Sequence, residues 1–86
     1  MGELFEVMLT GYPKAKFEHI ERVIHKHNRA YTHSEVHEMT LAVGKGDERV
    51  VAVYAEEHVA KNVVFELQYH GAEAHVRQPQ AQEDAA

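Results

Sequence analysis

The sequence predicts an α/β domain of the α+β sandwich type, in which a three-stranded sheet of order 2-1-3 carries three helices on one face. Apolar residues recur with period two in three segments and with helical periodicity in three others, in the order β-α-α-β-α-β. Because two helices connect the first strand to the second, these two strands are expected to run antiparallel. Because one helix connects the second strand to the third, those two are expected to run parallel. A single sheet then requires the first strand in the middle, with a right-handed crossover.

The first strand is expected over residues 5–10, because Phe5, Val7 and Leu9 alternate with polar or flexible neighbours. Gly11-Tyr12-Pro13 ends it, since proline lacks a backbone donor and glycine is permissive. A helix is predicted from Ala15 to Asn28, where the period becomes helical. Its apolar face comprises Phe17, Ile20, Val23, Ile24 and His27.

A capping box marks the start of the second helix: Thr32 can accept from the backbone N–H of Glu35, whose side chain can reach back to Thr32. The buried stripe of this helix is expected to comprise Val36, Met39, Thr40 and Val43. Gly44-Lys45-Gly46-Asp47 ends the helix.

The second half of the chain repeats the alternation of strand and helix. Residues 48–54 are rich in β-branched side chains and predict a strand. A third helix follows from Glu56, with Gly71 as its C′ residue. The buried stripe of this helix is Val59, Ala60, Val63, Val64 and Leu67. Residues 72–77 alternate again, so the domain is expected to span residues 1–77, and residues 78–86 are predicted to be a disordered tail.

Composition excludes several classes of function. The net charge is −5, with nine Lys and Arg against fourteen Asp and Glu. The chain has no basic stripe, so nucleic-acid binding is not expected. No apolar stretch approaches the roughly 20 residues that span a bilayer, and no signal peptide is evident. Cysteine is absent, which fits a reducing compartment, so a cytoplasmic location is expected.

Four segments resemble parts of two known protein families. Residues 5–12, Phe-Glu-Val-Met-Leu-Thr-Gly-Tyr, resemble the opening strand and turn of the C-terminal domain of the ribosomal stalk protein, and residues 71–76 resemble its closing strand. Residues 39–44 followed by residues 50–54 are similar to a segment of the ClpS protease adaptor. The resemblance implies the fold that both families share, and a role in docking a protein of the proteolytic or translation machinery.

The chain departs from both families at their recognition residues. ClpS holds the amino terminus of a substrate with an Asn-Asp pair after the first strand and a His after the second helix, whereas this chain has Gly11-Tyr12 and Gly44 there. Tyr12 is therefore expected to contact a partner without anchoring an amino terminus. The basic residues with which the stalk domain binds translation factors are matched by Arg22 and Lys26.

The chain has eight histidines, so a metal-binding domain is the second hypothesis. Apart from a divalent metal, no cofactor is expected. His33 and His37 lie four residues apart on one side of the second helix, a spacing that suits a divalent metal. Glu38, or His19 or His25 across the helix pair, is a candidate third ligand. The alternative is a solvated helix face. His27 falls on the apolar stripe, which favours a packed, hydrogen-bonded histidine.

No constellation predicts an enzyme. Ser34 is the only serine and falls in the capping turn, and nothing near it supplies an oxyanion hole. Gly44 and Gly46 lack the Lys-Ser/Thr that follows in a phosphate-binding loop.

The third helix gives the clearest indication of a binding surface. With Val63 and Leu67 buried, Phe65 and Tyr69 point to the opposite side, one turn apart. Two exposed aromatic side chains at this spacing are a common anchor for a partner, and the alternatives are a homodimer contact or cover within the chain. We therefore expect a non-catalytic protein-binding domain. The alternatives are a histidine-rich metal or pH sensor and a structural homo-oligomer subunit.

Overall fold

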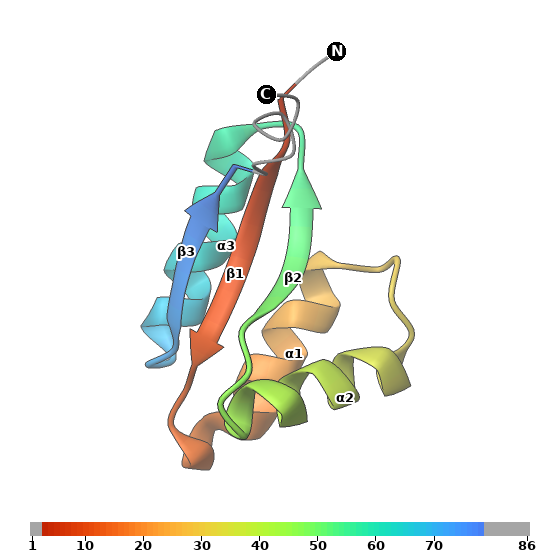
Figure 1. The fold of residues 1–86 in the computed structure, drawn as a ribbon, viewed down its shortest axis with the longest axis vertical. Coiled ribbons are helices and arrows are strands. Elements are labelled where there is room, and N and C mark those ends of the chain that lie inside the picture. Colours follow the sequence, from red (N-terminus) through yellow and green to blue (C-terminus); the bar gives the residue numbers. More distant parts are fainter. Residues whose placement is uncertain (1–2, 79–86) are drawn as a thin grey trace, which may run out of the picture.

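A computed structural model of the chain describes residues 3–78 and confirms the predicted order of elements (Figure 1). The prediction of a disordered tail falls on residues 78–86, of which 79–86 lie outside the described residues. The predicted first helix begins with a short 3₁₀ turn after Pro13. The elements are β1 (Phe5–Gly11), η1 (Lys14–Lys16), α1 (Phe17–His27), α2 (His33–Gly44), β2 (Arg49–Tyr54), α3 (Glu57–Tyr69) and β3 (Glu73–Arg77).

The sheet has the predicted order β2-β1-β3, and β1 pairs antiparallel with both neighbours. The two outer strands therefore run in the same direction, as one intervening helix requires (Figure 1). Glu6 lies opposite Val53 on one side and Arg77 on the other.

Each ladder contains one irregularity. The pairing with β2 skips Val51 between Val7 and Met8, so that Val51 and Ala52, although consecutive, are both buried. A β-bulge has this effect because it inserts one residue and interrupts the alternation of faces. The pairing with β3 skips Thr10, whose hydroxyl donates to the main-chain carbonyl of Glu73 at 3.1 Å.

One face of the sheet carries the core, and the other carries mostly polar side chains, with Met8 buried among them. Val7 and Leu9 are fully buried in a cluster to which all three helices contribute. On the opposite face Arg77 Nη2 lies 2.6 Å from Glu6 Oε1. The predicted open face is thus confirmed, and α1 and α3 lie on the other side of the sheet (Figure 1).

The helix ends follow the signals in the sequence. The Thr32 hydroxyl accepts from the Glu35 amide at 3.1 Å, and the Glu35 carboxylate accepts from the Thr32 amide at 2.7 Å. At the end of α3, Gly71 has φ +90°, its N–H donates to the Gln68 carbonyl, and the N–H of Ala72 donates to that of Leu67. This is a Schellman motif, which favours glycine because other residues rarely adopt a positive φ.

Candidate protein-binding site

The outer face of α3 presents two aromatic side chains to solvent. Phe65 is 71% exposed and Tyr69 is 79% exposed, whereas Val63 and Leu67 on the same helix are buried. The predicted phase of this helix is therefore confirmed. We call Phe65 and Tyr69 the aromatic patch. Soluble monomeric proteins rarely expose large contiguous apolar patches, and neighbouring exposed aromatic rings are candidates for an interaction site.

The aromatic patch is continuous with the contact between α3 and α1. The ring of Tyr69 meets that of His70 edge-on, with centroids 5.3 Å apart. His70 in turn lies against His19 of α1, again at 5.3 Å. The patch therefore belongs to a surface formed by two packed helices.

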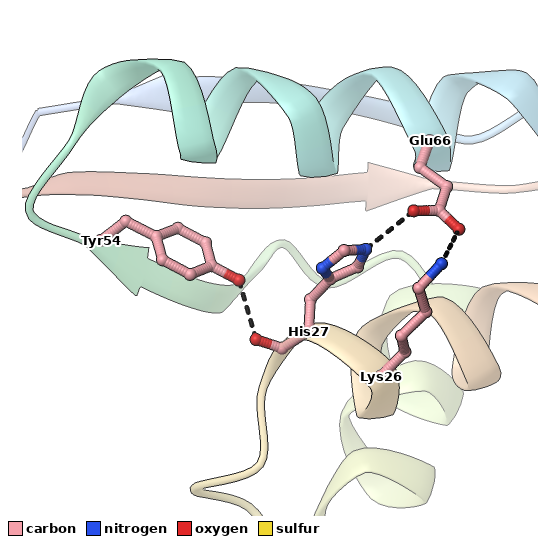
Figure 2. Close-up of polar contacts among 4 residues, drawn as sticks. All are labelled: Lys26, His27, Tyr54 and Glu66. Atoms are coloured by element: carbon pink, nitrogen blue, oxygen red, sulfur yellow. Dashed lines mark hydrogen bonds and ion pairs between the residues drawn. The ribbon is translucent and has the colours of Figure 1, made fainter.

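Glu66, next to Phe65 in the sequence, links α3 to the last turn of α1 through two polar contacts (Figure 2). Its Oε1 lies 2.7 Å from His27 Nε2, and its Oε2 lies 2.9 Å from Lys26 Nζ. Hydrogen bonds from His27 and Lys26 lower the pKa of Glu66 below its ordinary value. His27 is half-buried and hydrogen-bonded, as its place on the apolar stripe predicts.

The same turn of α1 is also fastened to the sheet. The hydroxyl of Tyr54 in β2 donates to the main-chain carbonyl of His27 at 2.8 Å (Figure 2). Burial raises the pKa of Tyr54, so this hydroxyl remains a donor at neutral pH. The last turn of α1 is thus held both by α3 and by β2.

A second apolar surface lies where β1 leads into α1, near the end of α2. Its pocket of about 280 Å³ is lined by Tyr12, Lys14, Phe17, Leu41, Gly44 and Lys45. Within residues 3–78, neither of the two lysines takes part in an ion pair. We call it the lysine-rimmed pocket.

Tyr12 forms a wall of the lysine-rimmed pocket. Its hydroxyl donates to the Thr40 carbonyl at 2.7 Å, and burial, with the charge of Glu21, raises its pKa. A Cβ on Gly44 would lie 2.6 Å from this hydroxyl, so glycine is what lets α2 approach the ring.

The structure distributes the predicted partner-binding residues over three places. Phe65 and Tyr69 form the aromatic patch, and Lys26 pairs with Glu66, the residue between them that follows Phe65 in the sequence. Tyr12 lies in the lysine-rimmed pocket, and Arg22 lines a separate hollow between α1 and α2. Sequence reasoning did not single out the pocket itself, although exposed Leu41 lies outside the predicted stripe of α2.

The two histidines expected to share a metal have different neighbours. His37 Nδ1 lies 2.7 Å from Glu21 Oε2, and its ring meets that of Phe17 edge-on. His33 lies instead against His25 of α1, with ring centroids 5.2 Å apart. Among residues 3–78, no three His, Asp or Glu side chains gather as a metal site would require.

A scan against protein-family models and a search of curated proteins each find no match to this chain. The finding at the level of fold is a small α+β domain with an antiparallel sheet of order 2-1-3. No helix in the described part of the chain has the length and apolar character needed to cross a membrane.

Proposed function

We propose that this chain is a non-catalytic protein-binding domain and that a partner protein binds the aromatic patch of α3. The observation that carries the proposal is the exposure of Phe65 and Tyr69, one helical turn apart, on a helix whose opposite face fills the core. Aromatic side chains are over-represented among the residues that dominate binding energy at protein interfaces.

The energy available from this patch suits a specific interface. Burying one large apolar side chain contributes about 1.5–3 kcal/mol, which corresponds to one to two decades in affinity. Glu66 pairs α3 with α1 next to Phe65, so the helix backbone that carries the patch is already ordered before binding. A hydrophobic groove that accepts two rings four residues apart is the complementary surface.

The resemblance to ClpS and to the stalk C-terminal domain supports a partner in the proteolytic or translation machinery. Both families use this arrangement of elements to dock other proteins rather than to perform chemistry. The only serine, Ser34, lies exposed in the first turn of α2, and the proposal assigns it no catalytic role.

Comparative capture from the source cell tests the proposal. The tagged wild-type chain, Phe65→Ala, Tyr69→Ala and the control Leu41→Ala serve as bait, and each captured protein is then titrated in purified form. The proposal expects a partner that both aromatic variants lose and Leu41→Ala retains. A partner lost only with Leu41→Ala would assign binding to the lysine-rimmed pocket and overturn the proposal.

Self-association is the competing explanation for the aromatic patch. Sedimentation of the purified chain at micromolar concentrations separates the two, because a homodimer forms without any other protein. A dimer that Phe65→Ala dissociates would make the patch a contact between copies of this chain.

A further inference from the structure

We infer that the lysine-rimmed pocket binds an acidic peptide segment, one apolar side chain of which enters the pocket while its carboxylates meet Lys14 and Lys45. The pocket has a volume of about 280 Å³ and lies where β1 leads into α1, near the end of α2. It shares no residue with the aromatic patch of α3, so the inference goes beyond the proposed function and does not depend on it.

The charge at the rim of the pocket favours an anionic ligand. The chain as a whole is acidic, with a net charge of −5, yet two lysines line this one pocket. Both are exposed, and within residues 3–78 neither forms an ion pair, whereas Lys26 and Lys61 do. Burial and the charge of Glu21 raise the pKa of Tyr12, but the Glu21 carboxylate lies 2.7 Å from His37 Nδ1 and pairs with neither lysine. Carboxylates of a ligand would therefore supply the opposite charge that the rim lacks.

The interior of the pocket suits an apolar side chain. Its walls are the rings of Tyr12 and Phe17 and the exposed side chain of Leu41. The Tyr12 hydroxyl donates to the Thr40 carbonyl at 2.7 Å. The Phe17 ring has its centroid 6.2 Å from that of Tyr12 and 5.4 Å from that of His37, which it meets edge-on. These contacts hold both rings in place before a ligand arrives, so binding requires little ordering of the walls.

The size of the pocket favours one residue of a peptide over an enclosed small ligand. Small-molecule sites have volumes of about 300–1,000 Å³ and bury most of the ligand. This pocket is smaller, and four of the six residues that line it are exposed. A single Phe or Leu side chain can enter it while the peptide backbone stays at the surface, where neighbouring Asp or Glu side chains reach the lysines. A Phe at a free amino terminus would bring an ammonium group to the same lysines, which repel it.

Titration of the isotope-labelled full chain with short peptides, followed by NMR, tests the inference. The probe is the acetylated and amidated pentapeptide Glu-Asp-Phe-Asp-Glu, and two blocked controls are Glu-Asp-Ala-Asp-Glu and Lys-Lys-Phe-Lys-Lys. We expect the Phe probe to bind with a Kd of about 0.1–1 mM and to shift the amide signals of Leu41, Gly44 and Lys45. The Ala peptide should bind roughly tenfold more weakly or worse, because it buries no large apolar side chain, and the basic peptide should not bind.

Neutralising the rim tests the contribution of charge. The double variant Lys14→Gln with Lys45→Gln should bind the Phe probe about three- to tenfold more weakly, since exposed ion pairs contribute modestly, and added salt should weaken binding to the wild type. The matched control, Arg29→Gln with Lys61→Gln, has the same net charge and should bind like the wild type. All four substituted side chains are exposed, so both variants should fold, and their amide spectra without peptide check this.

Several outcomes would overturn the inference. These are no shifts at the pocket with the Phe probe, equal binding of the Ala or the basic peptide, and an equal loss of affinity in the control variant. Shifts centred on Phe65 and Tyr69 would assign the peptide to the aromatic patch instead. Pocket signals that move when the free chain is diluted would make a second copy of the chain the occupant. Millimolar binding does not survive the washing of a capture experiment, so the test of the aromatic patch stands apart from this one.

Discussion

The side-chain amide of Asn28 donates a hydrogen bond of 2.7 Å to the main-chain carbonyl of Val51. Val51 is the residue that the β-bulge leaves without a partner on β1. On the other outer strand, the amide of Gln68 donates to the carbonyl of Ala74 at 3.1 Å. Helix side chains thus satisfy a carbonyl on each outer strand, where unpaired groups invite pairing with another chain.

Replacing Asn28 by Ala is expected to lower the free energy of unfolding by about 1–3 kcal/mol, because a part-buried carbonyl loses its donor. Urea unfolding of this variant and of Asn62→Ala, an exposed amide on α3, measures the difference. Equal stability of the two variants would show that solvent replaces the Asn28 contact without cost.

Replacing Glu66 by Gln is expected to make stability less dependent on pH. The pKa of Glu66 is lowered in the folded state by His27 and Lys26, so the carboxylate stabilises the fold at neutral pH. This contribution is lost as pH falls below the ordinary Glu range, about 4.3, and through the folded pKa. Glu66→Gln should be about 1 kcal/mol less stable than wild type at pH ~7, and this difference should shrink as the pH falls through the lowered pKa of Glu66 in the folded state.

Unfolding free energies measured across this pH range test the expectation. Glu57→Gln is the matched control, because Glu57 forms an exposed i,i+4 pair with Lys61 at 3.5 Å. A constant difference between Glu66→Gln and wild type at all pH values would contradict the assignment.

Replacing Gly44 by Ala is expected to cost about 1–2 kcal/mol, although alanine is the better helix former by about 1 kcal/mol. The new Cβ would lie 2.6 Å from the Tyr12 hydroxyl and force the ring off the Thr40 carbonyl. In a Tyr12→Phe background the nearest ring atom is at 3.3 Å, so the same substitution should cost less there. A double-mutant cycle by thermal unfolding measures this coupling, and strict additivity would contradict the proposed contact.

Peptides that begin with Phe, Leu or Tyr are expected to bind no better than peptides that begin with Ala. The resemblance to ClpS sets Tyr12 and Gly44 against the polar residues that would hold an amino terminus, but the Tyr12 hydroxyl already donates to Thr40 and Gly44 has no side chain to offer. Without such anchors a site discriminates weakly among amino termini. Fluorescence anisotropy with labelled peptides checks this, and micromolar binding that requires a free amino terminus would refute it.

Local signals in the sequence predicted most of the fold. Alternation in residues 5–10 located β1, and the capping box at Thr32 and the glycine at position 71 located helix ends to within a residue. The phase of α3 predicted the exposure of Phe65 because a helix with one buried face determines where the other side chains point.

Features that depend on tertiary contact could not be predicted. A run of β-branched residues does not show where a bulge will fall. The burial of both Val51 and Ala52 therefore could not be predicted from the sequence. His33 lies beside His25 rather than His37 because the packing of α2 against α1 brings that pair of rings together. Spacing within one helix carries no information about a neighbouring helix.

The effect of Phe65→Ala on partner affinity tests the central claim most directly. The claim predicts a dissociation constant at least tenfold higher, about 1.4 kcal/mol, with the free energy of unfolding within about ±0.5 kcal/mol of wild type. Leu67→Ala, two residues along α3 and fully buried, should instead destabilise the fold by about 2–5 kcal/mol. Unchanged affinity for Phe65→Ala, or a loss of stability like that of Leu67→Ala, would contradict the claim that Phe65 is an exposed anchor for a partner.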